Sequence, residues 1–398
     1  MTIEAEERPR LARILPFLTL TVFLDLVGYG IILPLLPSYI GELGGSPQVV
    51  GILFASFAAA QLVAMPVLGR TSDRHGRRRV IAISLAANAV AMILFSLAIR
   101  HHALWLLFAS RILAGVTSGN IGACQAAIAD ISEGAERVRA MGKVGAGIGL
   151  GVMLGPWIGG RASTLGDAAP PLFAAAMAFV ALVGVLVFLP ETNTRALVTA
   201  RPHLSLKALG SNPKIAIVMT LYFFMFLYMT TLQTALALLV AERFGWTKER
   251  VGDLFGLFGL VTLVMQFGVV GPISRRMTSP SVLSGAGVLA AIGLAAIALA
   301  SSSTVLVGGL VVLAMAVGLS HPQLASLASQ YAGPGQQGTV LGFAQSSGAL
   351  SRTIGPILWG SLYHHLGPSA AFLGGTSAAV VVAVVASIAR KAPRTVEP

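Results

Sequence analysis

Long apolar segments, each about the length of a membrane-crossing helix, follow one another along almost the whole chain. A helix that crosses the hydrocarbon core of a bilayer needs about 20 mostly apolar residues. Twelve segments meet that requirement: residues 14–40, 48–68, 80–99, 103–126, 141–162, 172–189, 215–240, 251–270, 281–300, 304–325, 339–362 and 369–389. The pattern predicts an all-α polytopic membrane protein with twelve transmembrane helices.

The basic residues are shared unevenly between the two sets of alternate loops. Segments on the side of the termini hold 20 lysines and arginines, and the opposite loops hold five. Because cytoplasmic loops carry the excess of basic residues, both termini are expected in the cytoplasm. The N-terminal segment has no small-residue cleavage site, so residues 14–40 are expected to remain as the first span of an inner-membrane protein.

Composition narrows the class of protein further. Of the 398 residues, 55% are hydrophobic and 11% are charged, whereas a soluble domain carries roughly 25% charged residues. A soluble catalytic domain is therefore excluded, and lipid is the expected surrounding. The formal charge of +12 comes from basic residues in short loops, so it indicates membrane orientation and not a nucleic-acid partner. Cys124 is the single cysteine, and neither a disulfide, a metal nor another cofactor is expected.

The two halves of the chain resemble each other at an offset of 200 residues. Gly155-Pro156 recurs as Gly355-Pro356, and Gly160 recurs as Gly360. A polar, basic segment between them predicts an N-terminal six-helix half at 1–190, a cytoplasmic linker at 191–213 and a C-terminal six-helix half at 214–398. Many secondary transporters build a central site at the interface of such repeats.

Asp25 is the one acidic residue placed well inside a predicted span. A carboxylate at that depth is costly unless it is protonated, paired or in contact with water. A role in loading and releasing protons is therefore favoured over a structural hydrogen bond. Arg111 in the fourth span is the expected partner, because it shares a small, polar helix face with Gly115 and Gln125. An arginine that extends outward to lipid headgroups is the alternative.

The loop between the second and third spans is the most specific local signal. It reads Gly69-Arg70-Thr71-Ser72-Asp73-Arg74-His75-Gly76-Arg77-Arg78-Arg79. Gly69 would permit close helix approach, Gly76 a tight turn, and Asp73 can pair with Arg77. Such contacts would stabilise one conformation and break in another. A gate is favoured over a simple topology signal, and its candidate residues are Gly69, Asp73, Arg74, Gly76, Arg77 and Arg78.

Glycines recur every four residues in the fifth span, at Gly147, Gly151, Gly155 and Gly159. This spacing predicts a groove for close helix packing. Pro156 removes a backbone hydrogen bond and would allow a bend. A hinge is favoured over packing alone, and its candidate residues are Gly142, Gly151, Gly155, Pro156, Gly159 and Gly160.

Apolar and aromatic side chains with a few polar groups share faces of spans in both halves. Such walls suit drug-sized amphiphiles, although helix packing would give the same pattern. The candidate residues of a substrate cavity are Tyr29, Phe54, Gln61, Gln125, Tyr222, Phe226, Gln233 and His321.

Taken in order, these motifs resemble the major facilitator superfamily, and specifically its twelve-span drug:proton antiporters, of which the bacterial tetracycline efflux pumps are the most similar. The likeness rests on Leu24-Asp25-Leu26-Val27-Gly28-Tyr29-Gly30, the loop 69–79, Arg111 with Gly115 and Gly119, and the glycines of 142–160. It implies export of a hydrophobic or amphiphilic small molecule in exchange for protons. By resemblance, Asp25 and Arg111 take the proton-coupling roles, and Asp73, Arg74 and Arg77 form the cytoplasmic gate. A monomer in the lipid bilayer is expected.

Two positions depart from the tetracycline pumps. Those pumps carry an acid in the third span, where residues 80–99 have none, so tetracycline itself is not favoured. The second copy of the gate loop, Gly271-Pro272-Ile273-Ser274-Arg275-Arg276, has arginine in place of the acid. Export of a native metabolite or sugar, or flipping of a lipid, remains an alternative. A membrane enzyme is disfavoured because one mid-membrane acid does not make a catalytic cluster.

Overall fold

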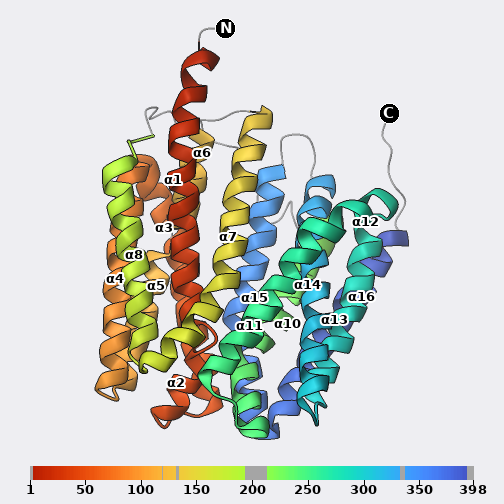
Figure 1. Ribbon diagram of the computed structural model, residues 1–398. Coiled ribbons are helices and arrows are strands. Elements are labelled where there is room, and N and C mark those ends of the chain that lie inside the picture. The colour runs from red at the N-terminus through yellow and green to blue at the C-terminus, as the bar shows by residue number, and fades with distance from the viewer. Residues whose placement is uncertain (1–2, 119, 131–133, 193–212, 332–336, 392–398) are drawn as a thin grey trace. The chain divides into compact units, whose positions relative to one another are not determined.

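All regular structure in the described part of the chain is helical (Figure 1). The computed structural model describes residues 3–118, 120–130, 134–192, 213–331 and 337–391. The elements are α1 (Ile3–Ile32), α2 (Leu36–Glu42), α3 (Pro47–His75), α4 (Arg77–Arg100), α5 (Leu104–Thr117), α6 (Asn120–Asp130), α7 (Gly134–Ala162), η1 (Ser163–Leu165), α8 (Ala169–Phe188), α10 (Pro213–Phe244), α11 (Lys248–Val264), η2 (Met265–Val269), α12 (Val270–Arg276), α13 (Ser279–Ala298), α14 (Ser303–Tyr331), α15 (Gln337–Leu366) and α16 (Pro368–Lys391). The all-α prediction is confirmed.

Most of these helices are long and apolar enough to cross a membrane. Ten candidate spans are found among the described residues. The two remaining long helices, α7 with 29 residues and α15 with 30, coincide with the predicted fifth and eleventh spans but are not among those ten. The count of twelve therefore stays a prediction.

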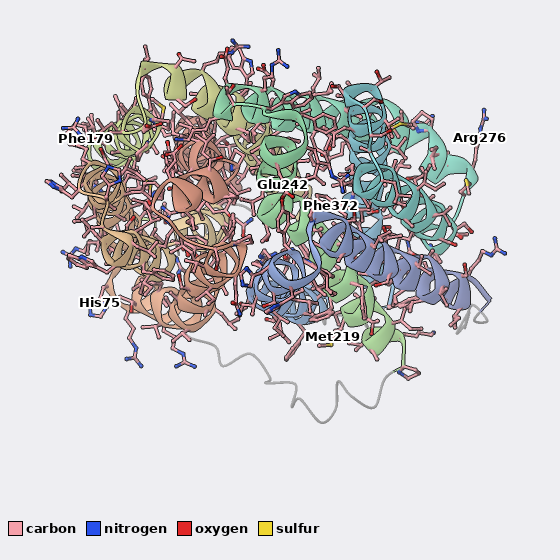
Figure 2. All side chains as sticks on the ribbon, turned by 90° about the horizontal axis from the view of Figure 1, so that it is seen from below. His75, Phe179, Met219, Glu242, Arg276 and Phe372 are labelled. Atoms are coloured by element: carbon pink, nitrogen blue, oxygen red, sulfur yellow. The ribbon has the colours of Figure 1, made fainter. Side chains whose placement is uncertain are left out.

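Large apolar side chains cover the outside of the helices. Trp105 on α5 is 72% exposed and Phe179 on α8 is 59% exposed, and Figure 2 shows Phe179 at the outer edge of its bundle. Phe267 in the π-helical turn η2 is 70% exposed. Soluble proteins do not expose apolar surface so freely, and helices are one of the two structures that satisfy their own backbone in lipid. These faces are those expected against acyl chains.

The chain forms two compact units. Unit 1 comprises residues 1–46, 56–199 and 245–256, and unit 2 comprises residues 47–55, 200–244 and 257–398. Each unit therefore includes one short helix end from the other half of the sequence: the start of α3 belongs to unit 2, and the start of α11 belongs to unit 1. The predicted linker lies mostly outside the described residues, and the predicted boundaries at 190 and 214 stay predictions.

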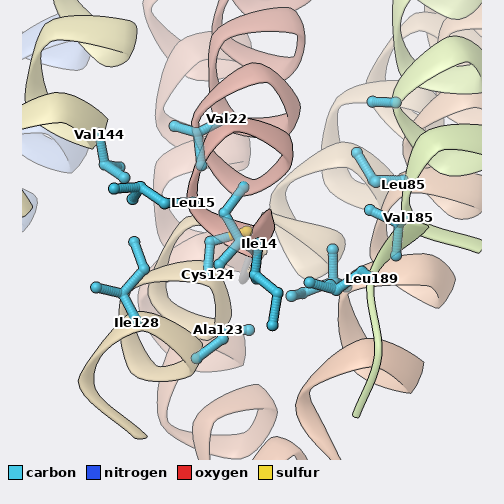
Figure 3. Close-up of a cluster of buried hydrophobic side chains, with 14 of the residues drawn as sticks. Ile14, Leu15, Val22, Leu85, Ala123, Cys124, Ile128, Val144, Val185 and Leu189 are labelled. Atoms are coloured by element: carbon cyan, nitrogen blue, oxygen red, sulfur yellow. The ribbon is translucent and has the colours of Figure 1, made fainter. Parts of the chain in front are cut away.

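The core of unit 1 forms around α1. This helix packs against α7 and α8, and α4 packs against α5 and α8. Val22, Leu85, Cys124, Val144 and Val185, from five different helices, lie in one cluster and are almost fully buried (Figure 3). Cys124 is a free thiol inside this cluster. In unit 2, α13 packs against α14 and α16, and α10 packs against α15 and α16.

The predicted first and fourth spans coincide with the candidate membrane spans Ile14–Glu42 and Leu104–Ile128, and each comprises two of the described helices. The first breaks between α1 and α2 at residues 33–35, because Pro34 has no N–H and its ring excludes the preceding turn. The fourth comprises α5 and α6, and residue 119 between them lies outside the described residues. The helix face predicted to join Arg111 to Gln125 stays a prediction.

Candidate functional site

Asp25 on α1 meets a polar side chain of α4. The Asn88 Nδ2 donates a hydrogen bond to Asp25 Oδ1 at 3.1 Å, and both side chains are half-buried. Asp25 has further interactions besides this one. Sequence reasoning missed Asn88, although an amide inside the mostly apolar span 80–99 was a usable signal. The structure thus supports the acid with an amide from the third predicted span.

Arg111 on α5 lies in a pocket of sulfur and aromatic rings. It is 5% exposed, and its Nη2 is 3.6 Å from Met92 Sδ. Its guanidinium carbon is 5.1 Å from the centroid of the Phe95 ring and 5.8 Å from that of Phe57. Among the described residues, its buried Nε has no hydrogen-bond partner. Cation–π and sulfur contacts therefore surround this arginine, and its expected pairing with Asp25 stays a prediction.

Tyr29 is nevertheless joined to this pocket. Its ring centroid is 5.6 Å from that of Phe57, so α1, α3 and α5 meet through one aromatic contact chain. Gly115, one turn after Arg111, allows the approach, because a Cβ there would lie 2.9 Å from Ala60 Cβ. The Arg111 pocket and the helix carrying Asp25 are therefore in contact through Phe57.

Arg77 is the centre of the gate loop. The expected ion pair is present, with Arg77 Nη1 2.5 Å from Asp73 Oδ1. Arg77 Nε also lies 3.0 Å from Asp130 Oδ2, and Nη1 donates to Ser72 Oγ at 2.6 Å. The backbone N–H of Arg77 donates to Glu191 Oε1 at 2.8 Å. Asp130 at the end of α6 thus contacts the Arg77 guanidinium and Glu191 beyond α8 accepts from its backbone, and both acids were missed from the sequence. The Arg77 side chain is only 10% exposed.

The two glycines of this loop behave differently. Gly76 has φ = +98° and separates α3 from α4, so the expected tight turn is present. The Glu191 carboxylate lies where a Cβ of Gly76 would be, which is a second reason for glycine here. Gly69, in contrast, has no described atom within 4 Å of its Cβ position. The expected close helix approach at Gly69 therefore stays a prediction.

The glycine groove of α7 is filled by the backbone of α1. A Cβ on Gly151 would lie 2.8 Å from the Phe23 carbonyl oxygen, and a Cβ on Gly155 would lie 2.6 Å from the Val27 carbonyl oxygen. Gly159 approaches the next turn of α1 in the same way. The predicted close packing is confirmed, and its partner is the helix that carries Asp25. Gly142 and Pro156 also lie in α7, and the hinge role stays a prediction.

Two further glycine contacts occur at equivalent places in the repeat. In unit 1, Gly160 of α7 meets the start of α11, where its Cβ would lie 2.9 Å from Gly252 Cα. In unit 2, Gly360 of α15 meets the start of α3, where its Cβ would lie 2.6 Å from the Pro47 carbonyl oxygen and 3.2 Å from Gly51 Cα. The sequence offset of 200 between Gly160 and Gly360 is thus repeated in the packing.

A cluster of ion pairs near the start of α11 was counted from the sequence only as loop charge. Lys248 Nζ lies 2.7 Å from both Glu42 Oε1 and Asp167 Oδ1, and 4.2 Å from the Tyr39 ring centroid. Beside it, Arg161 pairs with Glu249 and Asp253. All of these residues belong to unit 1. They join the start of α11 to α2, α7 and the segment before α8.

The predicted cavity residues are divided between the units. Tyr29, Gln61 and Gln125 belong to unit 1, and Phe54, Tyr222, Phe226, Gln233 and His321 belong to unit 2. Within unit 2 the structure brings three of them together: the Phe226 ring lies 6.3 Å from Tyr222 and 5.5 Å from His321, centroid to centroid. In the described ranges, no group of three or more His, Cys, Asp or Glu side chains could hold a metal ion.

Known proteins resemble the chain over nearly its whole length. The family model described as Major Facilitator Superfamily matches residues 18–356 and 218–398. The tetracycline resistance protein, class B, of Escherichia coli is 30% identical over 352 residues, which cover 86% of each chain. Multidrug resistance protein 2 of Bacillus subtilis is 30% identical over 359 residues, again 86% of each chain. The solved structure of the human organic anion transporter MFSD10 matches with a TM-score of 0.70 and 26% identity, over 96% of this chain and 99% of that one.

The match agrees with the resemblance found from the motifs, including the likeness to tetracycline resistance proteins. The family model covers both predicted halves, and the described helices include ten candidate membrane spans. The relatives are transporters and not enzymes. The chain therefore belongs to the Major Facilitator Superfamily and is a multi-pass membrane transporter.

Proposed function

We propose that this transporter is a proton-coupled antiporter that exports a hydrophobic or amphiphilic small molecule by alternating access. It would act as a monomer in the bacterial inner membrane, with both termini in the cytoplasm. The observation that carries the proposal is Asp25, a half-buried carboxylate in the interior of α1 that is bound by the Asn88 amide. A titratable group at such a depth is the group best placed to carry a proton across the membrane.

Three contacts support the assignment of α1 as the proton-carrying helix. The Asn88 amide orients the carboxylate from α4, and the glycine groove of α7 holds the backbone of α1 on the opposite side. Tyr29, one turn after Asp25, reaches the Phe57 ring that also contacts Arg111. A change at the acid can therefore reach α3, α5 and α7 through direct packing. The names of the relatives, which refer to tetracycline, multiple drugs and organic anions, favour an amphiphilic cargo.

The test uses inverted membrane vesicles that contain the full chain. Tetracycline, ethidium and fluorescein are added in turn, and proton release is followed with a pH-sensitive dye. At least one of them should release protons from vesicles with the wild-type chain and not from empty vesicles. Asp25→Asn mimics the protonated acid permanently, so it should abolish gradient-driven accumulation while substrate binding persists. Asp25→Glu keeps a carboxyl group and should retain part of the activity. Full gradient-driven accumulation by Asp25→Asn would refute the proposal.

A further inference from the structure

A cavity in unit 2 lies where α12 ends and α13 begins. Its volume is about 450 Å³. Residues 274–279 line it together with Gln323, Ser326 and Gln330 of α14. All of these residues belong to unit 2, whereas Asp25 belongs to unit 1. The cavity is therefore separate from the carboxylate proposed to carry the proton.

The lining of this cavity is positively charged. It includes Arg275 and Arg276 and no carboxylate. In the described part of the chain, neither arginine forms an ion pair or a hydrogen bond. Both side chains are exposed, and Figure 2 shows Arg276 extending outward from its unit. Because the sequence has no Asp or Glu between Asp253 and Glu397, an anionic ligand is the natural counterpart of these two guanidinium groups.

Hydroxyl groups held by two glutamines also line the cavity. Gln323 Nε2 donates a hydrogen bond to Ser274 Oγ at 2.6 Å, and Gln330 Nε2 donates to Ser326 Oγ at 2.9 Å. A serine hydroxyl that accepts a hydrogen bond still has its own O–H to donate. Ser274 and Ser326 can therefore each donate to an oxygen atom of a ligand. Gln323 is only 3% exposed, so its hydrogen bond anchors Ser274 to the protein interior.

The first turn of α13 adds backbone donors at the same place. Thr278, at the N-cap position, makes no side-chain capping bond, and both Thr278 and Ser279 line the cavity. The first N–H groups of a helix have no partner within it, and they carry the positive end of the helix dipole. Phosphate groups bind at such helix starts. The two guanidinium groups, the two hydroxyl groups and this helix start together suit a phosphate group.

An exposed apolar strip leads away from the arginines along α11 and η2. It consists of Leu260, Val264 and Phe267, which are 51%, 56% and 70% exposed and are spaced as on one helix face. Leu260 precedes Arg275 by 15 residues (260 to 275), or about 22 Å at a rise of 1.5 Å per residue. One leaflet with its headgroup region measures about 20–22 Å, which is half of the bilayer. The apolar strip therefore has the length of a phospholipid whose phosphate group lies at Arg275.

We propose that the cavity binds the phosphate headgroup of an anionic phospholipid, whose acyl chains lie against the apolar strip. Arginine binds phosphate oxygens in pairs, and basic pockets between membrane helices bind such headgroups on the cytoplasmic side. Arg275 and Arg276 end a candidate membrane span, and the excess of basic residues predicts the cytoplasm for that end. A free phosphate ion would leave the apolar strip without a partner. The inference goes beyond the proposed function and does not depend on the exported compound.

The test is native mass spectrometry of the purified full chain with an equimolar mixture of phosphatidylglycerol and phosphatidylcholine that have the same acyl chains. Both lipids contain a phosphate group, but phosphatidylcholine also carries a compensating cation. The ratio of the two adducts is read within one spectrum, so it does not depend on the folded fraction of a variant. Wild-type protein should prefer phosphatidylglycerol, and Arg275→Gln and Arg276→Gln should each lower the ratio about fivefold. Arg390→Gln is the matched control, because it removes an exposed arginine of α16 in the same unit that does not line the cavity, and it should keep the wild-type ratio.

Two further measurements separate a lipid from a free phosphate ion. Phe267→Ser should lower the adducts of both lipids alike and leave their ratio unchanged, because it alters only the contact with the acyl chains. Phosphatidylglycerol should raise the melting temperature of the wild type in detergent, and inorganic phosphate or glycerol 3-phosphate should not.

The proposal is overturned if the wild type shows no preference for phosphatidylglycerol, or if Arg390→Gln lowers the ratio as much as Arg275→Gln does. It is also overturned if the soluble phosphates raise the melting temperature as much as the lipid does, which would assign the cavity to a free phosphate ion.

Discussion

Gly155→Ala adds one methyl group to the contact between α7 and α1. The new Cβ would lie 2.6 Å from the Val27 carbonyl oxygen and 2.7 Å from Gly30 Cα. A carbon atom needs about 3.5 Å from its neighbours, so the two helices must separate locally by roughly 0.8 Å. Both obstructing atoms are backbone, so no side-chain rotation relieves the clash. Overpacking of this kind costs about 1–3 kcal/mol, and we expect the upper end of that range.

Gly149→Ala is the matched control for this change. It places the same methyl group on the same helix, but no described atom lies within 4 Å of the new Cβ. Replacing glycine by alanine inside a helix stabilises it by up to about 1 kcal/mol. This gain is common to both alanine variants, so their free energies of unfolding should differ by the overpacking cost, about 3 kcal/mol at its upper end.

The assay is thermal unfolding of the purified protein in detergent, followed by size-exclusion chromatography of the soluble fraction. Gly155→Ala should melt several degrees below the wild type, and Gly149→Ala at or above it. Gradient-driven accumulation in inverted vesicles should fall with Gly155→Ala, because the displaced helix carries Asp25. An equal melting temperature for the two alanine variants would refute the packing argument. Unchanged melting with lost transport would instead favour the hinge role of α7.

Two other variants test the charged clusters. Asp73→Asn should reduce transport strongly while changing the free energy of unfolding by less than about 1 kcal/mol, because the Asp73 side chain is 50% exposed. Asp73→Glu should retain transport activity. Wild-type transport by Asp73→Asn would mean that the loop is only a topology signal. Lys248→Met leaves the Glu42 and Asp167 carboxylates without the ammonium group they share, so it should destabilise the protein by about 1–2 kcal/mol in thermal unfolding. Arg250→Met, at an exposed position in the same turn, should have little effect, and an equal effect of the two would contradict a specific role for Lys248.

The helices could be located from the sequence because each is a long apolar run, which a helix needs in order to cross the hydrocarbon core of a bilayer. The internal break was harder to predict. Pro34 lies within an apolar run, and its effect on the helix is visible only in the local backbone.

The candidate site was predictable where residues close in sequence contain the whole signal. The Asp73–Arg77 pair joins residues four apart across the turn at Gly76, and the glycine groove of α7 is a four-residue period. Partners from distant helices were not predictable in this way. Asn88 is 63 residues from Asp25, and Glu191 is 114 residues from Arg77. Periodicity shows which face of a helix is polar, but not which helix lies against it.

The two glycine contacts at Gly160 and Gly360 have a consequence for how the two halves of the chain become one molecule. Residues 47–55 complete unit 2, and residues 245–256 complete unit 1, although each segment is encoded on the opposite side of the segment 193–212. Two polypeptides divided within that segment would each carry the helix end that the other requires. Such fragments should reassemble when they are produced together in one membrane, because each fragment supplies a helix end that packs within the unit of the other. A single continuous chain would then ensure that both halves are produced in equal amounts. The exchanged helix ends would hold the halves together.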